Sequence, residues 1–160
     1  MYCIICIMDK KHFFFMEEAL KEAKKAFFKG EVPVGSIAVL NDRIIAKAHN
    51  STKKSKLFFA HAEFLVLQKI NYKSKNYRFE DITIYTTLEP CVMCLGALIQ
   101  TRIRKLYFGT SNFKLGFLTN VYFSFANVPY LRNISVKTGL LSEKSELILK
   151  KFFSFVRKKR

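Results

Sequence analysis

The sequence predicts an α/β domain in which helices cover a central sheet. Stretches with helical periodicity alternate with short apolar runs bounded by turn residues, as is typical of such folds. Half of the 160 residues are hydrophobic, so the chain can bury a core. With 6 Gly, 3 Pro and 4 Cys, collagen-like, disordered and disulfide-dense chains are excluded. Neither a repeat nor a linker is visible, and we expect a single domain over residues 1–160.

The first half of the chain predicts a helix followed by a β-hairpin. The helix covers residues 10–29 and ends at Gly30. The hairpin pairs residues 37–40 with residues 43–50 through the turn residues Asn41 and Asp42, and a polar loop follows at residues 51–56. The apolar positions of the helix recur at spacings of three and four, which predicts that its buried face consists of Phe13, Met16, Leu20, Ala23 and Phe27.

The second half of the chain continues the alternation. Residues 110–132 show no clear pattern. The expected elements are a helix at 60–70, a basic loop at 71–79, a strand at 82–87, a helix at 91–101, a strand at 105–109, an edge strand at 135–138 and a final helix from Ser142 to about residue 157.

The charge of the chain indicates a polyanionic partner. Lys and Arg number 28 and Asp and Glu 12, so the net charge is 28 − 12 = +16. Nucleic acid is the first expectation and an anionic membrane surface the second, although biased base composition would also enrich Lys. We find no apolar run long enough to span a bilayer and no signal-peptide pattern, so we expect a cytoplasmic protein.

The four cysteines form two C-x-x-C pairs, Cys3/Cys6 and Cys91/Cys94. In a cytoplasmic protein such pairs indicate metal or redox chemistry before disulfides, and a four-cysteine structural zinc site is one alternative. The other interpretation of the first pair is apolar packing or disorder. We expect residues 1–7 to be disordered, or to precede a translation start at Met8.

The second pair belongs to a constellation that predicts metal-assisted hydrolysis. His61 begins one expected helix, and Cys91 and Cys94 lie in the first turn of another. Thiolates and a neutral imidazole suit zinc, and three protein ligands leave the fourth tetrahedral position for water. Glu63 could take a proton from that water and deliver it to a leaving nitrogen. A lone His before an apolar helix is more often a cap or a core residue, and a lone C-x-x-C is a common motif. The combination of H-x-E followed by P-C-x-x-C, however, marks zinc nucleobase deaminases.

Three segments resemble the bacterial tRNA-specific adenosine deaminases of the cytidine/deoxycytidylate deaminase superfamily. They are residues 31–35 (EVPVG), 60–63 (AHAE) and 87–94 (TLEPCVMC), and the similarity covers nearly the whole chain. The resemblance implies a three-layer α/β/α fold with a mixed five-stranded sheet, one zinc ion per subunit and a homodimer. It also implies hydrolytic conversion of adenosine to inosine at the wobble position, position 34, of a tRNA anticodon stem-loop, with an arginine tRNA as the expected substrate.

The resemblance also implies roles for individual residues. His61, Cys91 and Cys94 match zinc ligands, and Glu63 matches the proton shuttle. Asn50 matches the asparagine that hydrogen-bonds the flipped base, although without the resemblance it is an ordinary turn residue. The remaining substrate-binding matches are Val34, Leu88 and Pro90 at the base, and Asn112, Lys114, Phe152, Phe153 and Arg157 near the RNA.

Two positions depart from the family pattern. Asn112 replaces an expected acid, which removes a negative charge near phosphates and weakens an acceptor for a ribose 2′-hydroxyl. We therefore hypothesise looser discrimination of RNA from DNA. His49 stands where a bulky aromatic is usual, and we interpret it as structural. The tail that carries Phe152 and Arg157 is alternatively an amphipathic helix with Phe152 and Phe155 in the core and a solvated basic end.

Three other functions are alternatives for this sequence. A deaminase of free cytidine or guanine would use the same chemistry but would not need such a basic surface. A non-catalytic zinc module that binds RNA would not need Glu63 beside the metal. A membrane-surface protein is the weakest alternative, because the expected amphipathic helices are already used to cover the sheet.

Overall fold

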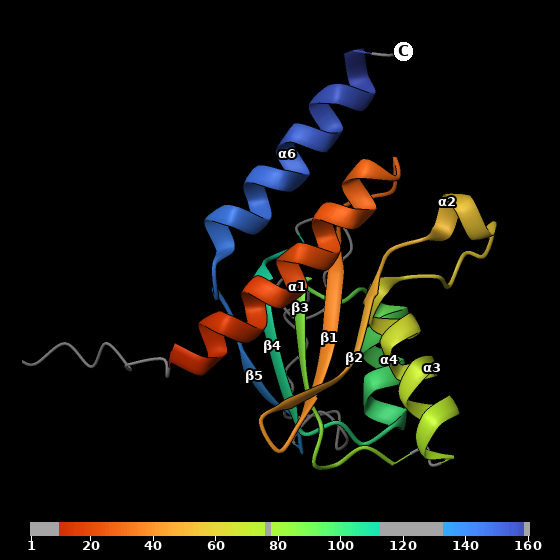
Figure 1. Cartoon of the computed structure of the whole chain (residues 1–160), viewed down its shortest axis with the longest axis vertical. Coiled ribbons are helices and arrows are strands. Elements are labelled where there is room, and N and C mark those ends of the chain that lie inside the picture. Colours follow the sequence, from red (N-terminus) through yellow and green to blue (C-terminus); the bar gives the residue numbers. More distant parts are fainter. Residues whose placement is uncertain (1–9, 76–77, 113–132, 159–160) are drawn as a thin grey trace, which may run out of the picture.

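The computed structural model describes residues 10–75, 78–112 and 133–158 and shows a five-stranded mixed sheet between two layers of helices (Figure 1). The strand order is β2-β1-β3-β4-β5. Strand β1 is antiparallel to β2 and β3, whereas β3, β4 and β5 are parallel. The strands are β1 (Gly35–Leu40), β2 (Arg43–His49), β3 (Thr83–Leu88), β4 (Lys105–Thr110) and β5 (Ser135–Lys137). The predicted α/β class, the mixed sheet and the edge position of β5 are confirmed.

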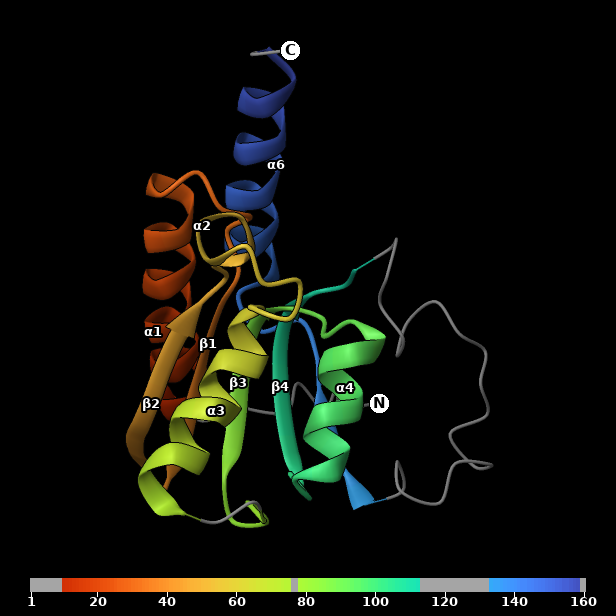
Figure 2. The same cartoon turned by 90° about the vertical axis from the view of Figure 1, so that its right-hand side faces the viewer.

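Helices cover both faces of the sheet. Helix α1 (Lys10–Phe28) packs on β1, β2 and β3, and α6 (Ser142–Lys158) packs on β4 and against α1. Helices α3 (Ala62–Ser74) and α4 (Val92–Gln100) cover the opposite face (Figure 2). The short α2 (Thr52–Ser55) projects beyond the end of the sheet. The predicted three-layer arrangement is therefore present.

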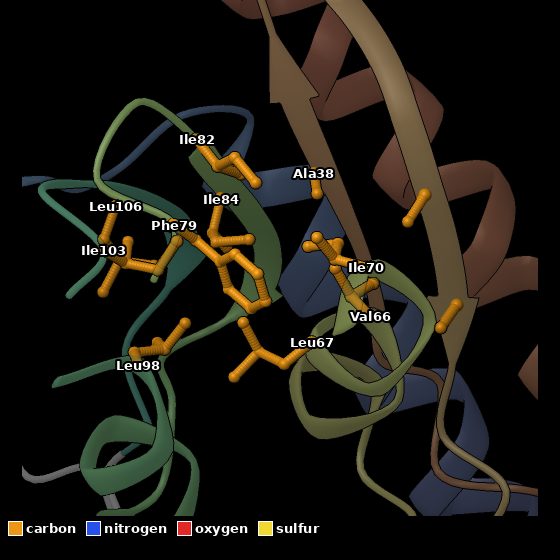
Figure 3. Packing of buried hydrophobic residues seen from close by; sticks show 12 residues of the cluster. Ala38, Val66, Leu67, Ile70, Phe79, Ile82, Ile84, Leu98, Ile103 and Leu106 are labelled. Carbon is orange, nitrogen blue, oxygen red and sulfur yellow. The ribbon is translucent and has the colours of Figure 1, made fainter. Parts of the chain in front are cut away.

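Alternation along the strands divides the core into two parts. In β1, Ile37 and Val39 face α1, while Ala38 faces α3 and α4, because successive strand side chains point to opposite faces. The larger part lies between the sheet and the helices α3 and α4, where Leu67 of α3 and Leu98 of α4 pack with Ile84 of β3 (Figure 3). Helices α3 and α4 are thus fixed on the sheet by buried apolar contacts.

The turn between β1 and β2 has the residues that its geometry requires. Asn41 and Asp42 have φ values of 49° and 57°, the left-handed region that Asn and Asp tolerate better than most residues. Both positive φ values match a type I′ turn, which suits the twist of paired strands. The hairpin predicted from these two residues is confirmed.

Three details of the sequence prediction are wrong. The expected loop at residues 51–56 contains α2, and α3 continues past residue 70 to Ser74. In α1, Phe13 is 39% exposed, and Phe15, at 4%, is buried in its place. At the start of α1 the buried face is therefore shifted by two residues from the predicted one. The apolar residues that the helix buries are Phe15, Met16, Ala19, Leu20, Ala23 and Ala26.

Close packing of α1 on β1 makes a strong prediction for Gly35. A Cβ atom at this position would lie 2.1 Å from the Ala19 carbonyl oxygen and 2.5 Å from the Ala23 nitrogen, both in the backbone of α1. Gly35→Ala must therefore displace the helix, and we expect it to lower the free energy of unfolding by about 3 kcal/mol in a denaturant titration. Gly96→Ala is the control, because its added Cβ would meet no atom within 4 Å apart from its chain neighbours and the nearby backbone of its own helix. This control should be neutral or stabilising by up to about 1 kcal/mol, and equal midpoints for the two variants would contradict the packing argument.

Several sequence expectations fall outside the described residues. They concern Cys3, Cys6, the start at Met8, Lys114 and most of residues 110–132. Across the described ranges, none of the helices combines the length and the apolar character needed to cross a membrane.

Candidate active site

The sheet topology brings separate parts of the chain to one end of the sheet. The parallel strands β3 and β4 end side by side, with Leu88 paired with Thr110. Because β1 is antiparallel to β3, its first residue, Gly35, lies at this same end and pairs with His49, the last residue of β2. Helices α3 and α4 both begin here (Figure 2). Loops after parallel strands and the amino ends of helices commonly form ligand sites.

Three potential metal ligands converge at this end. His61 and Cys91 are the N-cap residues of α3 and α4, both with extended backbone, and neither side chain forms a cap hydrogen bond. Cys94 lies one turn into α4. His61 Nδ1 lies 3.6 Å from Cys91 Sγ and 3.5 Å from Cys94 Sγ, and the three ligand atoms lie within 4.8 Å of one another. The predicted His61, Cys91 and Cys94 cluster is therefore assembled.

The electrostatics of the cluster fit a cationic occupant. A hydrogen bond from the Cys94 thiol, and then the interaction with His61, lower the pKa of Cys91 to about 4. The same hydrogen bond to Cys91, together with burial, raises the pKa of Cys94. A thiolate is therefore already favoured at Cys91, and one imidazole and two sulfur donors form a set that zinc prefers. This donor set, with His61 and Cys91 half-buried and Cys94 fully buried, fits zinc with one coordination position left open.

Glu63 lies in the first turn of α3 and is outside the ligand cluster. Its side chain is buried, with 4% of the residue exposed, and burial raises its pKa to about 7. A carboxyl group that titrates near neutral pH can both accept and release a proton under the same conditions. Its position and its pKa suit the proton transfer that the sequence pattern predicts.

A cavity of about 880 Å³ opens beside the ligands. The residues that line it include His61, Glu63 and Cys91. The cavity is large enough for a nucleotide-sized ligand. Of the residues that the sequence suggested for substrate binding, those that line it are Val34, Asn50, Leu88, Asn112, Phe153 and Arg157.

Two of the suggested substrate residues lie outside the described cavity lining, and the position of a third is not described. Pro90 is buried and is not part of the described cavity lining. Phe152 is buried, its ring centroid lies 6.0 Å from that of Phe27, and Lys53 Nζ lies 5.3 Å from its centroid. Lys114 is outside the described residues. Phe152 thus contacts α1 and α2 within the protein.

The alternative interpretation of the tail is correct for one phenylalanine and wrong for the other. Phe152 is in the core, as that interpretation expected, but Phe155 is exposed. His49, interpreted as structural, lies with Nδ1 2.8 Å from Glu22 Oε2 and with Nε2 2.9 Å from Lys29 Nζ. These contacts tie the end of β2 to α1.

Sequence reasoning missed part of the cavity wall. Leu149, Lys150 and Val156 of α6 line the cavity with Phe153 and Arg157. Their spacing of three or four residues places them on one face of the helix. This periodicity was visible in the sequence. Only the packing of α6 in the folded protein, however, shows that this face of the helix lines the cavity beside the metal ligands. Other lining residues without a sequence signal of their own are Thr52, Glu89 and Ser111.

A sequence profile of a known family matches much of the chain. The profile describes the cytidine and deoxycytidylate deaminase zinc-binding region, and it matches residues 9–110. This range contains α1, the five-residue EVPVG segment, both halves of the metal cluster and strands β1 to β4.

Individual proteins give a finer comparison. The tRNA-specific adenosine deaminase of Bacillus subtilis (strain 168) is 40% identical over 146 residues, which are 91% of each chain. A solved structure from a study of A-to-I editing by tRNA:A34 deaminases at the wobble position superposes with a TM-score of 0.79 at 36% identity, covering 85% of this chain and 99% of that one. A guanine deaminase from Nitrosomonas europaea shares the fold, with a TM-score of 0.77 at 21% identity over 89% of this chain and 84% of the other.

Proposed function

This chain belongs to the cytidine and deoxycytidylate deaminase zinc-binding family, and we propose from this premise that it converts adenosine to inosine at the wobble position of a tRNA anticodon. The observation that supports this proposal most strongly is the cavity lined by Glu63 beside the cluster of His61, Cys91 and Cys94. The reaction is hydrolytic: adenosine and water give inosine and ammonia. The enzyme is thus a hydrolase that acts on a C–N bond of a cyclic amidine.

His61, Cys91 and Cys94 would hold the zinc ion, which would supply Lewis-acid activation of a water molecule for addition at purine C6. Glu63 accepts a proton from this water and transfers it to the exocyclic nitrogen, which leaves as ammonia. Its buried position keeps the carboxyl group shielded from bulk water, and its raised pKa keeps both protonation states accessible near neutral pH. A purely structural metal site would not require this carboxyl group.

The cavity lining suits an extruded purine. Val34 and Leu88 offer apolar surface to a flat ring, and the side-chain amide of Asn50 offers a hydrogen-bonding group to the purine edge. The target base must leave its stack to enter, which requires least energy for an unpaired loop nucleotide. An anticodon loop meets this requirement, and an arginine tRNA is the substrate that we propose.

Basic and aromatic side chains of α6 belong to the cavity lining, namely Lys150, Phe153 and Arg157. Residues 47–78 contain eight Lys and Arg against one acid, Glu63. Of these cations, Lys53 and Lys54 lie in α2 with the lining residue Thr52, whereas α3 carries Lys69 and Lys73 away from the cavity end of the sheet. Cations neutralise phosphates and aromatic rings stack on unpaired bases. The net charge of +16 is consistent with this use, although a share of the cations serves internal contacts such as that of Lys47 with Glu18.

We also propose that the protein acts as a homodimer in the cytoplasm. Two strongly exposed apolar residues flank the metal ligands in sequence: Phe58, 80% exposed, shortly precedes His61, and Val92, 63% exposed, follows Cys91. Single exposed apolar residues are common, whereas a contiguous apolar patch marks a surface for association, and we propose that these two residues belong to such a surface. A second copy of the chain would cover these residues and complete the wall of the RNA site, and sedimentation at several protein concentrations would test this.

The substrate is tested with matched RNA stem-loops and small molecules. The zinc-loaded protein is incubated with an arginine anticodon stem-loop that carries an unmodified wobble adenosine, with a loop in which this adenosine is moved by one position, and with free adenosine, guanine and cytidine. We expect inosine in the first loop and little in the second. Preferential deamination of free guanine or cytidine would favour a small-molecule deaminase. No deamination by a zinc-loaded protein that still binds the loop would favour a non-catalytic RNA-binding module.

The departure at Asn112 gives a separate prediction. The residue lines the cavity, and its backbone N–H donates to Glu89 Oε2 at 2.9 Å, so its backbone is held at the site. Asn112→Asp restores a stronger acceptor for a 2′-hydroxyl, and we expect the ratio of RNA to DNA deamination to rise about tenfold, as one charge-assisted hydrogen bond permits. Matched RNA and DNA stem-loops provide the measurement, and an unchanged ratio would count against the hypothesis.

A further inference from the structure

We propose that Glu31 is a positioning residue that fixes the side-chain amide of Asn50 at the wall of the cavity, an inference that rests on the function proposed above. Glu31 lies three residues after the last residue of α1 and is 1% exposed. Its side chain is outside the described lining of the cavity, whereas Asn50 is part of that lining and is 5% exposed. Glu31 thus acts on the substrate only through another residue.

The carboxylate of Glu31 is surrounded by donors from the segment that follows β2. Its Oε1 accepts the backbone N–H of Lys54 at 2.7 Å, and its Oε2 accepts the backbone N–H of Lys53 at 3.1 Å. Both donors belong to the first turn of α2, whose own N-cap residue, Ser51, forms no side-chain cap hydrogen bond. A residue from a distant part of the chain therefore supplies the cap that α2 lacks locally.

The same carboxylate faces the Asn50 amide. Asn50 Nδ2 lies 3.4 Å from Glu31 Oε2 and 3.4 Å from Thr52 Oγ1. The Asn50 backbone is held independently, since its N–H donates to the Val34 carbonyl oxygen at 3.0 Å. The main remaining freedom of the residue is therefore the orientation of its side-chain amide.

The chemistry of a carboxylate determines that orientation. An ionised carboxylate can only accept hydrogen bonds, so it favours Nδ2 and repels Oδ1 at the same place. At 3.4 Å the hydrogen bond is long and contributes little to stability, but the reversed amide would place two oxygen atoms against each other in a buried site. Glu31 thereby engages Asn50 Nδ2 and leaves the acceptor Oδ1 for the purine.

Glu31→Gln tests this orientation at nearly constant size. A glutamine side chain can accept or donate, so both orientations of the Asn50 amide become possible. We expect kcat/KM for the wobble-adenosine stem-loop to fall about tenfold, as is typical when a supporting partner of a site residue is lost. Glu18→Gln is the matched control. Glu18 lies on α1, is also buried and is bonded to Lys21 and Lys47, but it contacts no described residue of the cavity lining in these hydrogen bonds. This control should leave kcat/KM unchanged.

A double-mutant cycle separates positioning from support of the fold. If Glu31 acts through Asn50, Glu31→Gln added to Asn50→Ala causes no further loss in kcat/KM. The same tenfold loss in both backgrounds, or no loss in the single variant, would overturn the proposal. Denaturation midpoints monitor folding, and if Glu31→Gln does not fold, Glu31→Asp enters the same cycle with the same expected result. Absence of inosine from the wild-type protein would instead contradict the proposed function itself.

Discussion

Replacement of Glu63 by glutamine should reduce deamination of a wobble adenosine by about 10²- to 10⁴-fold, the range typical of a lost general acid-base group. Glutamine has nearly the same shape but cannot carry the proton from water to the leaving nitrogen. Glu63 is buried and lies outside the cluster of potential metal ligands, so the substitution should leave zinc content and folding intact. The rate of inosine formation and the zinc content per chain are the two measurements.

The combination of these results matters more than the rate alone. Loss of activity with zinc retained assigns Glu63 to proton transfer. If zinc is lost as well, the carboxylate helps to hold the metal, and the assignment of three protein ligands is wrong. Full activity of Glu63→Gln would contradict the catalytic role.

Replacement of Cys94 by alanine should remove zinc and reduce deamination by about a thousandfold or more, because several kcal/mol of metal activation are lost. Cys94 is fully buried, and its Sγ is one of the three converging ligand atoms. Alanine fits the space. We therefore expect added zinc to raise the denaturation midpoint of the wild-type protein but not that of the variant. Zinc content, denaturation midpoint with and without added zinc, and inosine formation are measured together.

Cys6→Ala is the matched control for this experiment. The three-ligand site does not need either cysteine of the first pair, so this variant should retain zinc and activity. Loss of zinc from Cys6→Ala would support the four-cysteine alternative that the sequence left open, in which both C-x-x-C pairs hold one ion.

Most of the fold was predictable because local signals agreed with the final structure. Asn41 and Asp42 adopt the turn that their chemistry favours, and β5 is the edge strand that was expected. The short helix α2 was not predictable, since the carboxylate that caps it belongs to Glu31, far from it in sequence. In the extension of α3, Lys73 Nζ donates to the Ile45 carbonyl oxygen of β2 at 3.2 Å, a contact between elements that are distant in sequence.

The metal cluster was easier to predict than the cavity around it. His61, Cys91 and Cys94 could be joined because the two halves of the motif each begin a helix after a strand or a loop, and zinc requires a small set of donor types. The contribution of Leu149 and Val156 depends on how α6 crosses the sheet, which no local pattern states. Pro90 and Phe152 match the family motif but lie outside the described lining, so a motif position does not by itself place a side chain at the substrate.

The most direct test of the central claim is deamination of the wobble-adenosine stem-loop by the zinc-loaded protein in ¹⁸O-labelled water, followed by mass analysis of the nucleosides. The proposed reaction adds water at purine C6 and releases ammonia, so the inosine formed should carry the heavy oxygen. Glu63→Gln should give almost no labelled product in the same time. Absence of inosine, or inosine without the label, would contradict the account.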